Sequence, residues 1–340
     1  MWRFKPIEKP TIWGGGNIAA YKAGAKGWPA ADAPLCRHIG ESLELSSMAG
    51  CMSVVDGGPD SGLTLAELIG LHGTRIMGKS LYARFGNNFP IMVKLLDASD
   101  DLSVQVHPDD CMAAKRKLPH GKNEMWYIVG AAPGARLCAG FTRELSPEDY
   151  MGLVKEDRIT EALDYTPVHE GDAYYIPAGT VHALGRGCLA VEIQQTSDVT
   201  YRIFDFNRQD AQGNMRELHT HLAMEALCFG TKGEGRINYS DQPGMITELL
   251  ATPAFSVNRL RITSPYKRDY SATDYFKIIV LAQGAAALSD GSGSIDAAQG
   301  TVCLVGADSP WLSVEPAGEC VLIETYVDPG LLLNKENNIL

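Results

Sequence analysis

Several features are missing from this sequence, and each absence excludes a class of protein. No apolar run approaches the roughly 18 residues that a membrane-spanning helix needs, and the first residues, MWRFKPIEKP, lack the apolar core of a secretion signal. None of the eight cysteines belongs to a C-x-x-C pair, and they are scattered through apolar runs, which indicates buried thiols in a reducing compartment. We therefore expect a soluble cytoplasmic protein.

Basic residues are also fewer than acidic ones. The chain has 30 lysines and arginines against 41 aspartates and glutamates, a formal net charge of −11 at pH 7. Such a surface disfavours non-specific binding to nucleic acids and to anionic membranes. We expect a small molecule as the binding partner, and a monomer or a weak homo-oligomer in solution. If that small molecule is an anion, its pocket needs basic residues of its own.

The composition favours many short strands. The 35 glycines and 18 prolines cluster at turns between short apolar runs, and 340 residues fit two or three core-sized units. From residue 245 onward every pattern is that of a strand, and no histidine follows His221. We predict a mainly β protein of two units, residues 1–235 and 245–340, divided between residues 231 and 245. Helices are inserted in the first unit, and the second has no histidine-based metal site.

Three helices are indicated by their end signals. Thr64 begins the capping box TLAE and a helix that ends near His72. Ser146 followed by Pro147 is an N-cap with proline at the first helical position. A third helix is predicted over residues 218–229, where apolar residues recur at helical spacing and a glycine follows.

The stretch LSVQVHPDD, which begins at Leu102, carries the first chemical signal. Its residues alternate, so Ser103, Gln105 and His107 share one face of a predicted strand whose other face is apolar. A carboxylate, Glu124, then opens the next apolar run, MWYIV. An amide, an imidazole and a carboxylate brought together form a donor set for a divalent metal ion.

A second signal lies further along the chain. Residues 171–182 read G-x5-P-x-G-x-x-H, a strand followed by a tight turn from which His182 projects at a fixed place. Taken alone, each signal has a simpler interpretation: the first is a strand with a polar face, and the second is a histidine that follows a turn. The combination instead predicts one divalent ion held by Gln105, His107, Glu124 and His182, with coordination positions open for a substrate.

The turn motif at residues 171–182 resembles the second motif of the cupin β-barrel family, and His107 with Glu124 resembles the first. Gln105 stands where that first motif usually has a histidine. Four segments in order, SVQVHPDD, GKNEMWYIV, EGDAYYIPAGTVHALG and QTSDVTYRIFDFNR, resemble the short bacterial type I phosphomannose isomerases. This resemblance implies two cupin-type β-barrels of jelly-roll form, with helical insertions in the N-terminal one. It also implies one bound zinc ion and the interconversion of mannose 6-phosphate and fructose 6-phosphate.

The resemblance implies roles for individual residues as well. The family's metal ligands match Gln105, His107, Glu124 and His182, its proposed catalytic arginine matches Arg202, and its sugar-phosphate pocket matches Ser103, Lys122, Glu192 and Arg208. Because an arginine side chain stays charged, Arg202 suits the negative oxygens of an enediolate rather than the role of base. The proton that moves between C1 and C2 has three candidate carriers: Glu192, a water on the ion, or a desolvated Lys122. For the phosphate we expect Arg208 and Lys122, with the hydroxyl of Ser103 as a further donor.

Two other classes of protein are alternatives. A non-catalytic sugar-binding cupin would be expected to lack part of the site. An Fe(II) cupin oxygenase would use two histidines and a carboxylate, and His107, His182 and Glu124 supply that set. Gln105 and the basic residues favour a phosphorylated sugar instead. Lys94, in the apolar run FPIMVKLLDA, is interpreted as a structural lysine at the rim of the pocket.

Overall fold

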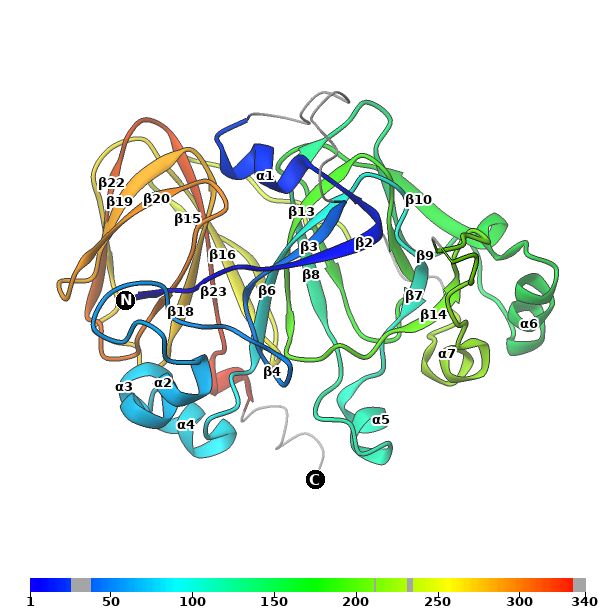
Figure 1. The fold of residues 1–340 in the computed structure, drawn as a ribbon, viewed down its shortest axis with the longest axis horizontal. Coiled ribbons are helices and arrows are strands. Elements are labelled where there is room, and N and C mark those ends of the chain that lie inside the picture. Colours follow the sequence, from blue (N-terminus) through cyan, green and yellow to red (C-terminus); the bar gives the residue numbers. More distant parts are fainter. Residues whose placement is uncertain (26–37, 211, 231–234, 333–340) are drawn as a thin grey trace.

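The computed structural model describes residues 1–25, 38–210, 212–230 and 235–332. It contains four large sheets, with short helices at the periphery (Figure 1). Within these ranges no helix has both the length and the apolar character needed to cross a membrane. The predicted mainly β fold is confirmed.

The N-terminal half contains two of the sheets. The first has six strands, in spatial order β11 (Ala173–Ile176), β8 (Glu124–Ala131), β13 (Cys188–Gln195), β6 (Ile91–Ala98), β3 (Ile39–Leu45) and β2 (Ile7–Gly15). The second has five strands, in the order β10 (Leu163–Pro167), β9 (Arg136–Phe141), β12 (His182–Leu184), β7 (Val104–Val106) and β14 (Tyr201–Phe204). Trp126 and Ile128 of β8 share a buried cluster with Leu137 of β9 and Leu184 of β12, so the two sheets face each other.

The C-terminal half repeats this plan. Its larger sheet has the order β1 (Trp2–Arg3), β21 (Val302–Val305), β18 (Lys277–Gln283), β23 (Cys320–Tyr326), β16 (Ser256–Ile262) and β15 (Ile246–Ala251). Its smaller sheet has the order β17 (Tyr266–Asp269), β22 (Trp311–Pro316), β19 (Ala285–Ser289) and β20 (Ser294–Ala298). Leu281 and Leu322 of the larger sheet pack with Leu288 and Leu312 of the smaller one.

The two six-stranded sheets meet face to face in the middle of the molecule. Val93 of β6 and Val191 of β13 belong to the same buried cluster as Val280 of β18 and Ile323 of β23. Each of these central sheets is therefore covered on both faces, which requires apolar side chains on both sides of its strands. This double covering explains the dense apolar run of β6.

The first strand lies in the C-terminal sheet rather than in the N-terminal half. β1 pairs with β21, with Trp2 opposite Leu304. The predicted division between residues 231 and 245 stays a prediction, and residues 231–234 lie outside the described ranges. In the described part of the chain the four large sheets are open layers, so the expected jelly-roll barrels also stay a prediction.

Short helices and turns connect the strands. They are α1 (Asn17–Lys22), α2 (Leu65–His72), α3 (Thr74–Met77), α4 (Lys79–Phe85), α5 (Asp110–Lys115), α6 (Pro147–Lys155), the 3-10 turn η1 (Ile159–Ala162) and α7 (Thr220–Ala226), together with the short pair β4 (Ser47–Met48) and β5 (Cys51–Met52). The predicted capping box is confirmed, because the Thr64 hydroxyl accepts from the Glu67 amide at 3.2 Å and the Glu67 carboxylate accepts from the Thr64 amide at 2.9 Å. The helix after Ser146 is confirmed as well, because the Ser146 hydroxyl accepts a hydrogen bond from the Asp149 amide at 3.0 Å.

Helix α7 is shorter than the helix predicted over residues 218–229. It ends at Ala226, and the next residue, Leu227, has an extended backbone with φ −68° and ψ 137°. The amide of Cys228 then donates to the carbonyl of Gly179 at 2.8 Å. A backbone hydrogen bond to the turn that precedes His182 therefore replaces the continuation of the helix.

The contact between Phe89 and Phe276 allows a test of how tightly the two halves are coupled. Both rings are buried, with centroids 4.4 Å apart, and they come from opposite sides of the central core. We expect Phe276→Ala to lower the free energy of unfolding by about 3–5 kcal/mol, because it leaves a cavity in a core that both halves share. Calorimetry should show one cooperative transition that moves to lower temperature. Met245→Ala, at an exposed position, should change little, and two separate transitions would contradict a shared core.

Candidate metal centre

Three neighbouring strands place a row of polar side chains on the inner face of the five-stranded sheet. His182 of β12 is the register partner of Gln105 on β7, and Gln105 is the partner of Arg202 on β14. Directly opposed residues in antiparallel strands have Cβ atoms about 4.5–5.5 Å apart, so these side chains lie side by side. Their neighbours Val104, Val106 and Ile203, which alternate with them, pack on the outer face of the sheet.

The facing sheet supplies the acidic side chains. Glu124 is the first residue of β8, and Glu192 lies on β13, directly opposite Lys94 of β6. One oxygen of Glu192 accepts from the indole nitrogen of Trp126 at 3.0 Å, and the other lies 3.0 Å from the ammonium of Lys94. The space between the two sheets therefore holds fixed charges on one side and the polar row on the other.

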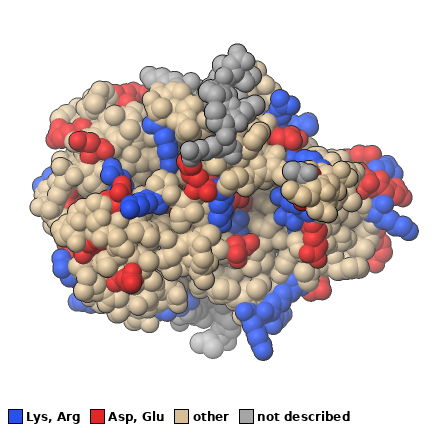
Figure 2. Space-filling view, in the orientation of Figure 1, with Lys and Arg blue, Asp and Glu red and all other residues tan. Residues whose placement is uncertain are grey.

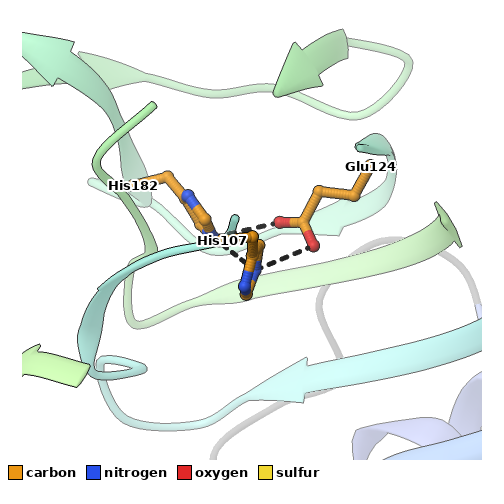
Figure 3. Close-up of side chains that lie close together, drawn as sticks. All are labelled: His107, Glu124 and His182. Atoms are coloured by element: carbon orange, nitrogen blue, oxygen red, sulfur yellow. Dashed lines mark hydrogen bonds and ion pairs between the residues drawn. The ribbon is translucent and has the colours of Figure 1, made fainter. Parts of the chain in front are cut away.

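His107, Glu124 and His182 converge on one point between the sheets (Figure 3). The Nε2 atom of His107 lies 3.3 Å from one carboxylate oxygen of Glu124, and the Nε2 atom of His182 lies 3.1 Å from the other. The two Nε2 atoms are 3.1 Å apart. All three side chains are buried, so water does not solvate these atoms.

The hydrogen bonds on the far side of each ring assign its tautomer. Nδ1 of His107 lies 2.8 Å from the carbonyl oxygen of Val199, and Nδ1 of His182 lies 2.9 Å from that of Thr180. A carbonyl only accepts, so each Nδ1 carries the proton and each Nε2 of a neutral ring presents a lone pair. Burial, with the nearby Lys122 charge, lowers the pKa of His107 to about 4, which keeps its ring neutral at pH 7.

Two lone pairs and a carboxylate therefore face one another, and this arrangement fits a bound cation. Both oxygens of Glu124 are buried, and neither accepts a well-directed hydrogen bond from the described residues. The Lys122 ammonium approaches from one side only, 2.7 Å from Oε2 of Glu124 and 3.1 Å from Nε2 of His107. Two imidazoles and a carboxylate are donors that zinc and similar divalent ions accept, and carbonyl partners on the second nitrogen are typical of metal-binding histidines.

Gln105 lies where a fourth donor is needed. Its amide nitrogen Nε2 is 3.2 Å from Nε2 of His182. A metal ligand must offer the amide oxygen instead, and a half-turn of the amide group brings that oxygen to the same place without moving the chain. The predicted quartet of Gln105, His107, Glu124 and His182 is thus brought together.

The electrostatics keep both interior carboxylates ionised. Burial would raise the pKa of Glu124, but its surroundings, with the nearby Lys122 ammonium first among them, outweigh burial and hold that pKa well below its ordinary value. Burial likewise opposes ionisation of Glu192, and Lys94 and then Lys122 outweigh it and lower the pKa.

A cavity of about 290 Å³ adjoins this centre. It is lined by five of the predicted site residues, namely Ser103, Gln105, Lys122, Glu192 and Arg202. On the face shown in Figure 2, basic and acidic side chains are intermingled over the surface. The cavity lining has four basic side chains and three acidic ones, so it is slightly basic within an acidic protein, which suits an anionic ligand better than the average surface does. The seven charged residues are Lys94, Lys122, Arg202, Arg216, Glu41, Glu192 and Asp198.

The structure separates Arg208 from the other predicted residues and adds new ones. Arg208 does not line the cavity, whereas Arg216, Lys94 and Glu41 do. Lys94 was interpreted as a rim lysine; it does line the cavity, but its ammonium is also paired with Glu192 at 3.0 Å and lies 3.7 Å from Glu41. A lysine in the middle of a dense apolar strand is a signal that could have identified it. Arg216 lies in a loop, where the sequence pattern carried no such signal.

Stacked antiparallel sheets enclose two imidazoles and a carboxylate beside a cavity with basic side chains. They define a class: a β protein whose interior has a side-chain cluster suited to a metal ion and room for a small polar ligand. Residues 1–130 match the model of the family described as phosphomannose isomerase type I, catalytic domain. Mannose-6-phosphate isomerase of Streptococcus mutans is 35% identical over 244 residues, 72% of this chain and 75% of that protein. Mannose-6-phosphate isomerase ManA of Bacillus subtilis is 34% identical over 264 residues, 76% of this chain and 79% of that protein.

The solved structures agree with these relatives. The mannose 6-phosphate isomerase from Bacillus subtilis superimposes with a TM-score of 0.82 at 29% identity, over 95% of this chain and 98% of that one. A putative mannosephosphate isomerase from Archaeoglobus fulgidus shares the fold, with a TM-score of 0.75 at 21% identity over 96% and 97% of the two chains. The chain belongs to the type I phosphomannose isomerase family.

Removing one imidazole tests whether this centre holds metal. We expect His182→Ala to lose most of its bound divalent metal, because a metal site of this kind depends on each of its few protein ligands. Elemental analysis of the purified protein, before and after dialysis, measures the effect. His169→Ala is the matched control, since the side chain of His169 is 77% exposed and lies away from the cluster. Full metal content in His182→Ala would remove His182 from the ligand set.

Proposed function

We propose that this protein is a metal-dependent aldose–ketose isomerase that interconverts mannose 6-phosphate and fructose 6-phosphate through an enediolate. One observation carries the proposal: in a member of this family, two imidazole lone pairs and a carboxylate converge beside a basic cavity. A non-catalytic sugar-binding protein or an Fe(II) oxygenase with the same three ligands is not favoured, because the relatives are named as isomerases.

The ion we propose is a single zinc, held by Gln105, His107, Glu124 and His182. A bound divalent ion would supply Lewis acidity toward the oxygens of the substrate at C1 and C2. With neutral imidazoles, a neutral amide and one carboxylate, the ligands leave a net charge of about +1 on a divalent ion, which preserves that acidity.

Arg202 stabilises the negative charge that develops on the enediolate in this proposal. It lines the cavity beside Gln105, and its Nη1 donates to the backbone carbonyl of Glu217 at 2.8 Å, which fixes the side chain. Its Nε is buried and has no hydrogen-bond partner among the described residues. A guanidinium held in place before the reaction stabilises developing charge without reorganising.

Glu192 is the residue we assign to carry the proton between C1 and C2. Its carboxylate is ionised, lines the cavity, and is oriented by Trp126 and Lys94. The other two candidates are a water on the ion and Lys122, and the ammonium of Lys122, 2.7 Å from Glu124, has no lone pair with which to accept a proton. A positioned carboxylate in the correct protonation state meets the requirements of a general base.

The remaining features of the proposal concern the molecule as a whole. The two sheet pairs would correspond to two cupin-type units of jelly-roll ancestry, residues 1–235 and 245–340, with the metal site confined to the first. We propose a cytoplasmic location and a monomer or weak homo-oligomer, in keeping with the cysteine pattern and the acidic surface.

A coupled assay tests the reaction and the metal together. We expect the protein to convert mannose 6-phosphate to fructose 6-phosphate, to lose this activity on chelation, and to regain it when Zn²⁺ is added. An oxygen electrode run in parallel should record no substrate-dependent uptake. Metal-loaded protein that shows no isomerisation would refute the proposed reaction, and oxygen uptake would favour the oxygenase alternative.

Variants at Arg202 and Glu192 test the two assigned roles. We expect Arg202→Ala to lower kcat by an amount equivalent to about 2–4 kcal/mol, as found when one oxyanion donor is removed. Glu192→Gln should lower kcat about 10²- to 10⁴-fold, the range for loss of a general base. Both variants should keep their metal, measured by elemental analysis. Glu156→Gln, on an exposed side chain, serves as the control, and unchanged turnover in either variant would remove that assignment.

A further inference from the structure

We infer that Arg216, rather than Arg208, supplies the guanidinium that binds the phosphate group of the substrate. The inference rests on the proposed function, since it assumes a phosphorylated sugar in the cavity, and it deepens that function by naming a specificity-determining residue. It depends on where the two arginines point, which the turn after β14 decides.

The backbone turns sharply after β14 and directs Arg208 away from the cavity. Phe206 and Asn207 both have positive φ, 56° and 53°, a conformation that non-glycine residues rarely adopt. Arg208 follows directly and uses all three guanidinium nitrogens on the chain itself. Nη2 donates to the carboxylate of Asp205 at 2.6 Å, Nη1 to the carbonyl of Asp101 at 2.5 Å, and Nε to the carbonyl of Asp205 at 3.2 Å. Nη1 also donates to the carboxylate of Asp100 at 3.4 Å, so four of the five N–H groups of Arg208 are engaged and no free edge of the guanidinium remains for a bidentate contact with phosphate.

Arg216 is held by the same aspartate but keeps one nitrogen uncommitted. Its Nε donates to Oδ2 of Asp205 at 2.7 Å, and its Nη2 donates to Oδ1. Its Nη1 has no hydrogen-bond partner among the described residues, and the side chain lines the cavity. The guanidinium is thus anchored along one edge, which leaves the other edge for an anion. Arginine commonly recognises phosphate through two parallel N–H···O hydrogen bonds from one edge of the guanidinium, a bidentate contact.

The loop that carries Arg216 is closed at its base. Gln209 and Met215 form a β-bridge, and the side chain of Asp210 accepts from the amide of Asn214 at 2.8 Å. Arg216 follows directly after this bridge. Its position is therefore determined by the chain and not only by the ion pair with Asp205.

The charges on this side of the cavity also favour an anion. Arg202 and Arg216 both line the cavity. Burial and the positive charge of Arg216, and to a smaller extent that of Arg208, lower the pKa of Arg202, while Asp205 and Glu217 act in the opposite direction. Asp198 also lines the cavity, but no ion pair joins it to either arginine in the described residues. Glu41 and Glu192, the other acidic lining residues, pair with Lys94. A phosphate would relieve the repulsion between the arginines.

The geometry also suits the two ends of the substrate. Lys122, the other predicted phosphate ligand, is paired with Glu124 at the metal centre, where C1 and C2 must react. Arg216 is instead held at Asp205, beyond the end of β14. Arg202 lies on that strand, beside Gln105, and all three basic side chains line the same cavity. A hexose 6-phosphate carries its phosphate at the opposite end from C1, so one ligand can reach both places.

Kinetics of Arg216→Met, with mannose 6-phosphate as substrate and inorganic phosphate as competitive inhibitor, test the inference. We expect KM and the inhibition constant for phosphate to rise about 10- to 100-fold, the range for loss of a hydrogen bond to a charged group. The value of kcat should change far less than KM, because the phosphate contact is the same in the ground state and the transition state. Arg208→Met should produce a smaller rise in KM than Arg216→Met does.

Arg261→Met is the matched control, because Arg261 and Arg216 have side chains 28% exposed and each pairs with an aspartate, while Arg261 lies outside the cavity. Unchanged KM and inhibition constant in Arg216→Met, or a larger effect at Arg208, would overturn the inference. If Arg216→Met does not fold, Arg216→Lys gives the same test, with a smaller rise in KM and in the inhibition constant expected.

Calorimetric titration with phosphate, of the wild-type protein and then of the Arg216 variant, separates this inference from the proposed function. If the wild-type protein shows no isomerase activity but its phosphate binding still depends on Arg216, only the proposed reaction is refuted.

Discussion

The convergence of two imidazole lone pairs and a carboxylate is the constraint on which the rest of the structure depends. His107 and His182 are held in one tautomer by carbonyl groups behind them, and Glu124 faces both. Lone pairs and carboxylate oxygens about 3 Å apart repel one another in a buried place, and the Lys122 ammonium lies beside them, 2.7 Å from Glu124 and 3.1 Å from His107. The scaffold must therefore hold these side chains together without metal, and two facing sheets do so.

The layered core provides that rigidity. The strands that carry the ligands belong to two sheets that pack on each other, and the larger sheet is backed by a second six-stranded sheet from the other half. The C-terminal half, which contains no histidine, thus contributes by covering the back of the six-stranded sheet that carries Glu124 and Glu192. The same dry interior strengthens each charge pair that lines the cavity, such as Lys94 with Glu192.

Much of the site was predictable because its signals are local. Alternation along a strand puts Gln105 and His107 on one face whatever the strand packs against. The turn before His182 and the capping box at Thr64 depend on residues within a few positions of each other. The end of α7 was not predictable in this way, because Cys228 leaves the helix to pair with a distant turn.

The amino-acid sequence by itself determined the mainly β fold through its periodicity. It also pointed to the proposed metal quartet through strand alternation and turn chemistry, and to Arg202 through resemblance to a known family. Tertiary structure alone decided that β1 joins the C-terminal sheet and that Lys94 faces Glu192, because strand register joins residues far apart in sequence. It also decided between Arg208 and Arg216. Both arginines follow the same strand, and only the positive φ angles after β14 and the position of Asp205 determine which guanidinium the cavity receives.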